Sequence, residues 1–205
     1  MALVKLNNRG VRSATTFGSI SALGEMRFIK KQTASSSATI SFVDGTSDVV
    51  LDNTYKEYLF TFNNIHPGTD DAEFQVGFRD GGTDYDATKT TTFFHAYHNE
   101  ADSYAAMAYS TGYDLAQSTA VQKQGDDLDT QNDANSCGYL HLFSPSSTTF
   151  VKHFMARISV QAFTQATDVY IAGYCNTTSA IDGVQFALTN SANIDAGDIC
   201  LYGIN

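Results

Sequence analysis

The clearest pattern in the chain is the alternation of apolar and polar residues between Thr54 and Ile65. Tyr58, Phe60 and Phe62 fall on one side of a period-two ladder, and mostly polar residues fall on the other. Aromatic residues at this spacing are typical of a β-strand with one face in a core and one face near water. The segment therefore predicts a half-buried strand.

Similar alternating segments recur along the chain, separated by residues that favour turns. They lie at residues 38–42, 74–78, 90–98, 139–143, 150–163, 169–173, 184–188 and 199–203. Asp80–Thr83, with its two glycines, predicts a hairpin because glycine supplies the positive φ of tight turns. About eight to ten strands without a long helix predict an all-β, antiparallel β-sandwich. A jelly-roll-like topology is preferred to an immunoglobulin-like one because the strands are many and the loops are long.

Two segments in the middle of the chain lack a clear pattern. Residues 104–109 fit either one helical turn or an irregular strand. Residues 125–135 are rich in acids and amides, which predicts an exposed loop at the rim of the sandwich.

Residues 1–36 show neither helical nor strand periodicity. We expect them to form an extended N-terminal arm that becomes ordered on a partner, ahead of a sandwich domain at residues 37–205. Residues 1–31 carry a net charge of +5 in a chain whose total is −10, so the two parts are suited to different partners. The arm residues expected to contact the partner are Leu3, Lys5, Leu6, Arg9, Val11, Arg12 and Phe17.

The charge and the cysteine count exclude several classes of protein. The acidic body argues against nucleic acid as a ligand because phosphate would be repelled. No apolar run is long enough to span a bilayer, and the first residues lack the apolar core of a signal peptide, so we expect synthesis in a cytoplasm. Cys137, Cys175 and Cys200 form an odd, sparse set that predicts reduced thiols and no disulfide.

The sequence names no catalytic, cofactor or metal site. His95 and His98 have a short spacing, but residues three apart on a strand point to opposite faces and cannot easily share an ion. The aspartates do not follow the order of a calcium loop, and no nucleotide-binding or hydrolase motif is present. Tyr104, Tyr109 and Tyr113 form a candidate ligand rim, because tyrosine rings can stack on sugars; the alternative is that they fill cross-strand or interface positions.

Five stretches are informative together: Met1–Gly10, Asn53–Pro67, Phe150–Phe154, Asn176–Ile181 and Ile194–Ile204. These stretches resemble a family of virion structural proteins from tailed bacteriophages of marine bacteria, of the kind found in cyanophages and pelagiphages. The resemblance spans nearly the whole chain and implies a particle component of fibre, tail or head-decoration type. It implies location in the virion and carries over no catalytic residue.

Three functions are therefore compared. The first is a non-enzymatic, surface-displayed virion subunit that other virion proteins hold through its N-terminal arm. The second is a glycan-binding module for host attachment, and the third and weakest is a polysaccharide hydrolase. The low-charge, tyrosine- and amide-rich surface, together with the family resemblance, favours a homo-oligomer, with a trimer preferred.

Overall fold

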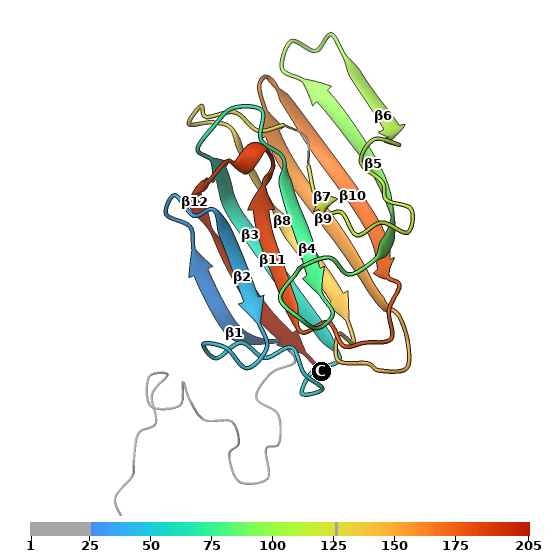
Figure 1. Cartoon of the computed structure of the whole chain (residues 1–205). Coiled ribbons are helices and arrows are strands. Elements are labelled where there is room, and N and C mark those ends of the chain that lie inside the picture. Colours follow the sequence, from blue (N-terminus) through green and yellow to red (C-terminus); the bar gives the residue numbers. More distant parts are fainter. Residues whose placement is uncertain (1–25, 126) are drawn as a thin grey trace, which may run out of the picture.

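The computed structural model describes residues 26–125 and 127–205, which fold into two antiparallel β-sheets packed face to face (Figure 1). The larger sheet has eight strands in the order β1 (Met26–Thr33), β12 (Ile194–Ile204), β3 (Glu57–Pro67), β8 (Asn135–Phe143), β9 (Lys152–Ala162), β10 (Gln165–Cys175), β5 (Lys89–Asn99) and β6 (Ala105–Tyr109). The smaller sheet has four, in the order β2 (Thr39–Val43), β11 (Gly183–Leu188), β4 (Phe74–Arg79) and β7 (Gln122–Lys123). The only helix of the described part is a single 3₁₀ turn, Thr189–Ser191. The predicted all-β sandwich is confirmed.

The strand order is that of a jelly roll. Strands β1 and β12, β2 and β11, β3 and β8, and β4 and β7 form antiparallel pairs that alternate between the two sheets. This is the arrangement that results when one long antiparallel ribbon of strands wraps around a common core. Two insertions extend it: β5 and β6 follow β4, while β9 and β10 follow β8, and all four join the larger sheet. Figure 1 shows β5 and β6 reaching beyond the smaller sheet.

The aromatic face predicted for residues 54–65 lies in the core. Tyr58, Phe60 and Phe62 of β3 are buried against the smaller sheet. Phe186 of β11 is the centre of this packing, with ring centroids 5.4 Å from Phe60, 5.1 Å from Phe62 and 5.7 Å from Phe74. Edge-to-face and offset contacts of this kind favour a single arrangement of the core.

The predicted boundary between arm and sandwich at residues 36 and 37 is wrong. Met26–Thr33 forms β1 and pairs with β12 along its whole length. The strand was missed because it lies at a sheet edge, where no position is fully buried, and because its register shifts between Phe28 and Lys30. Both features remove the period-two signal. The arm residues from Leu3 to Phe17 lie outside the described residues.

The hairpin predicted at Asp80–Thr83 is also wrong. The segment turns, with φ of +111° at Gly81 and +75° at Gly82, but it connects β4 of the smaller sheet to β5 of the larger one. Glycine marks where the chain reverses; the choice of pairing partner depends on the core that each flanking strand covers.

The structure also decides the two middle segments that lacked a clear pattern, residues 104–109 and 125–135. Residues 105–109 form strand β6, so the helical alternative for residues 104–109 is wrong. The segment 125–135 is not a fully exposed loop, because Leu128 and Ala134 are buried and Leu128 exchanges two backbone hydrogen bonds with Ala72. Two buried apolar side chains and the backbone bridge to Ala72 therefore hold this acidic segment against the sandwich.

Candidate functional site

The three tyrosines of the predicted ligand rim do not share one site. Tyr104 and Tyr113 line a pocket of about 290 Å³ at the end of the sheet where the β5–β6 and β9–β10 turns lie. We call it the end pocket; its lining residues are His95, Tyr97, Tyr104, Tyr113, Asp127, Ala162, Phe163 and Gln165. Tyr109 lies on the opposite face of the sheet, beside Phe94, and donates a hydrogen bond from its hydroxyl to Asp114 at 2.6 Å.

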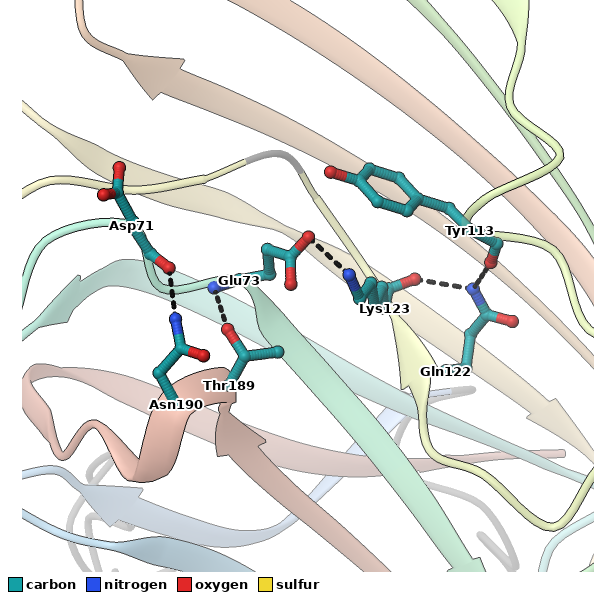
Figure 2. Close-up of polar contacts among 7 residues, drawn as sticks. All are labelled: Asp71, Glu73, Tyr113, Gln122, Lys123, Thr189 and Asn190. Carbon is teal, nitrogen blue, oxygen red and sulfur yellow. Dashed lines mark hydrogen bonds and ion pairs between the residues drawn. The ribbon is translucent and has the colours of Figure 1, made fainter.

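Tyr113 is held in the end pocket by a buried amide (Figure 2). The Gln122 side chain donates from Nε2 to the Tyr113 carbonyl at 2.9 Å, and its Oε1 accepts from the Thr91 hydroxyl at 2.6 Å. Lys123 places its ammonium 4.6 Å from the centre of the Tyr113 ring while it pairs with Glu73 at 2.6 Å. The backbone of Tyr113 is thus held by Gln122 and its ring by Lys123, while the residue also lines the pocket.

Tyr104 is fixed by the turn that precedes β6. The Asn99 side chain accepts hydrogen bonds from the backbone N–H groups of Ser103 and Tyr104, each at 3.0 Å. The Tyr104 hydroxyl lies 2.7 Å from that of Tyr97, with ring centroids 5.2 Å apart. An asparagine that closes its own turn in this way gives the chain a defined shape without secondary structure.

The second surface is the face of the eight-stranded sheet that points away from the smaller sheet, here called the outer face. Of the eleven exposed large hydrophobic side chains in the described part, seven lie on it. They are Met26, Phe28, Phe94, Met107, Tyr109, Tyr139 and Met155. Single exposed apolar residues are ordinary on a protein surface, but seven on one face of a sheet make that face a candidate interaction surface.

A continuous row of side chains crosses the outer face at right angles to five strands. In register they are Tyr139, Arg157, Tyr170, Phe94 and Tyr109, from β8, β9, β10, β5 and β6. The Tyr170 and Phe94 rings are stacked at 4.9 Å with an interplanar angle of 4°, and the Arg157 guanidinium lies 4.9 Å from the centre of Tyr170. Cross-strand pairs of this kind stiffen the sheet and form a ridge.

Hollows lie on both sides of this ridge, because neighbouring positions carry small residues. One groove of about 480 Å³ runs over Ala172, Gly173 and Met155. The other, about 230 Å³, runs over Ala96 and Ala166. Ridge and grooves together give the outer face a relief into which a second surface could fit.

Two pairs of opposite charges lie on the outer face, Arg157 with Asp168 and Lys31 with Asp198. Arg157 makes two hydrogen bonds to Asp168, at 3.0 Å from Nε and 2.7 Å from Nη2, and this contact holds the pKa of the Asp168 carboxyl below its usual value. Lys31 pairs with Asp198 at 2.8 Å, and this hydrogen bond lowers the pKa of Asp198. Paired charges weaken the field that the acidic chain presents at this face.

The histidines and cysteines considered as possible metal ligands lie apart from one another. His95 points toward the end pocket and His98 toward the outer face, as the strand geometry predicts. The three cysteines are free thiols. Within residues 26–125 and 127–205, no three His, Cys, Asp or Glu side chains gather into a metal-binding group. Nor does that part of the chain contain a helix long and apolar enough to cross a membrane.

Comparison with known proteins yields no match among family models, curated proteins or solved structures. The function is therefore argued from the two surfaces just described.

The outer face was missed by sequence reasoning, although a signal for it exists. Phe94, Tyr139 and Met155 occupy the positions that alternate with core residues, so their strands carry large apolar groups on both faces. A strand of this type belongs either between two covering layers or under a partner.

Proposed function

We propose that the protein is a non-enzymatic structural subunit of a bacteriophage virion, displayed on the particle surface, whose copies associate through the outer face. The observation that carries this proposal is the gathering of seven exposed apolar side chains on one sheet face. An isolated chain leaves this surface in water, and covering it would release about 25 cal/mol for each Å² of apolar area.

The partner that best fits the outer face is a second copy of the same chain. Copies of a chain with net charge −10 repel each other over most of their surface. On the outer face the Arg157–Asp168 and Lys31–Asp198 pairs are already internally balanced, so two such faces can approach with less repulsion. The ridge and its flanking grooves supply the relief that a self-complementary contact needs.

The jelly-roll topology agrees with this proposal by analogy, because viral capsid domains are among the proteins that use it. The sequence resemblance to virion proteins of marine tailed phages points the same way. Residues 1–25 then serve as the link to other virion proteins, since Lys5, Arg9 and Arg12 against Glu25 give them a charge opposite to that of the acidic body.

The test is to locate the protein in purified particles. Antibodies to the sandwich domain should label intact virions, and mass spectrometry of the particles should find the chain in several copies per particle. A Met155→Asp variant, which places a charge on the outer face, should be present at reduced occupancy. Recovery of the chain only from the particle-free lysate would contradict the proposal.

A further inference from the structure

The end pocket has the composition of a small-molecule site. Five aromatic or imidazole rings line it, together with the polar side chains of Asp127 and Gln165. The rings are those of His95, Tyr97, Tyr104, Tyr113 and Phe163. Binding pockets are typically lined by apolar and aromatic side chains with a few polar groups that fix orientation. The volume of about 290 Å³ lies at the lower end of such pockets, which suits a ligand of one ring.

We propose that the end pocket binds one pyranose ring of an uncharged saccharide. A pyranose presents C–H groups on its faces and hydroxyls around its edge, so it needs aromatic rings and hydrogen-bonding groups together. Tyr104 is suited to contact the ring face, because 57% of its surface is exposed while its backbone is held by Asn99. Asp127 and Gln165 of the same lining carry a carboxylate and an amide, which can bond to sugar hydroxyls.

The charges around the end pocket disfavour an anionic ligand. Asp127 belongs to its lining, and Lys123, whose ammonium lies 4.6 Å from the centre of the Tyr113 ring, is already paired with Glu73 at 2.6 Å. The Asp127 carboxylate would therefore repel an anion, while Lys123 is already engaged by Glu73. An uncharged sugar loses nothing from this arrangement, because its hydroxyls can donate to the carboxylate.

A second observation comes from the turn between β9 and β10. Phe163 is an exposed aromatic residue with φ of +54°, at the first position of a two-residue turn where glycine is usual. This backbone is held by neighbours, since Gln161 Nε2 donates to the Phe163 carbonyl at 2.9 Å and Glu100 N–H donates to the Thr164 carbonyl at 2.8 Å. A strained position that carries a large exposed ring at a pocket rim is characteristic of a functional site.

The chain offers a matched pair of variants for the test. Tyr104 and Tyr109 lie five positions apart with 57% and 52% of their surfaces exposed, but only Tyr104 lines the end pocket. Tyr104→Ala and Tyr109→Ala should therefore perturb folding to a similar, small degree. The probes are the methyl pyranosides of glucose, galactose, mannose and N-acetylglucosamine, with glucuronic acid as the anionic comparison.

Saturation-transfer NMR on the full chain should detect binding of at least one uncharged pyranoside and little transfer to glucuronic acid. Tyr104→Ala should weaken that binding about tenfold or more, while Tyr109→Ala should change it less than about twofold. The proposal is overturned if none of the four pyranosides receives saturation at millimolar concentration. It is also overturned if both variants weaken binding equally, or if glucuronic acid binds as tightly as the uncharged pyranosides. Because the end pocket and the outer face use different residues, either result leaves the proposed assembly function to its own test.

Discussion

Met155 provides the sharpest test of the outer face. It lies on β9 between His141 of β8 and Ala172 of β10, borders the larger groove, and has 50% of its surface exposed. Full burial of a methionine side chain is worth about 1.5–3 kcal/mol, so covering the exposed half should contribute about 0.8–1.5 kcal/mol per copy. A contact between two copies loses this contribution twice, so Met155→Ala should raise the dissociation constant of the assembly about tenfold to a hundredfold.

Met155→Asp should have a much larger effect. An aspartate at this position must lose water against a copy of itself, and an unpaired buried carboxylate costs several kcal/mol. The dissociation constant of the assembly should then be about a thousandfold higher than that of the unchanged chain. The separated monomer should keep its fold, with an unfolding free energy lower by at most about 1 kcal/mol, because the position faces outward.

Sedimentation velocity over a concentration series measures both variants. The matched control is Val121→Asp, which adds the same charge at an exposed apolar residue beside Gly77 of the smaller sheet, away from the outer face. The control should sediment like the unchanged chain. The reasoning is refuted if Met155→Asp keeps the unchanged mass, or if Val121→Asp dissociates the protein to the same extent.

Three further predictions follow from the core and the arm. Phe186→Ala should lower the free energy of unfolding by about 3–5 kcal/mol in urea titration, because it empties the centre of the aromatic cluster, while the exposed control Phe150→Ala should change it little. Burial raises the pKa of the Cys175 thiol from 9.0 to about 12, so the folded state keeps a proton that the unfolded chain loses as the pH rises above 9. The free energy of unfolding should therefore be about 1.4 kcal/mol lower at about pH 10 than at pH 8. Cys175→Ala should lack that decrease, and an equal decrease in the variant would contradict the assignment. Deletion of residues 2–25 should leave a soluble, folded sandwich that no longer joins particles, and normal occupancy in virions would show that the arm is not the anchor.

The sequence predicts those strands in which buried and exposed residues alternate, because the pattern within the strand then shows which face is in the core. Tyr58, Phe60 and Phe62 alternate cleanly because one face of β3 is core and the other is not. The edge strand β1 gives no such signal, because its residues are half-exposed on both faces. The hairpin error at Gly81 has the same origin, since a turn residue specifies a reversal of the chain but not the sheet to which the next strand belongs.

The candidate sites depend even more on neighbours that sequence spacing does not reveal. Tyr104, Tyr109 and Tyr113 cluster in the sequence, but β6 begins at residue 105, so Tyr109 lies in a strand and points outward while the other two lie in loops that meet at the end pocket. The outer-face row joins residues of β8, β9, β10, β5 and β6, and its partners are set by two insertions into the jelly roll. No local pattern encodes that register.

Hydroxyl-radical footprinting of the assembled protein tests the self-association of the outer face most directly. In the isolated chain Met107 is 75% exposed and Met155 50% exposed, while Tyr104, in the end pocket, is 57% exposed. If copies associate as proposed, Met107, Met155 and Tyr139 should be protected at concentrations where the protein is oligomeric, and Tyr104 should react as it does in dilute protein. If the reactivity of Met107 and of Met155 stays the same at all concentrations, the account is contradicted.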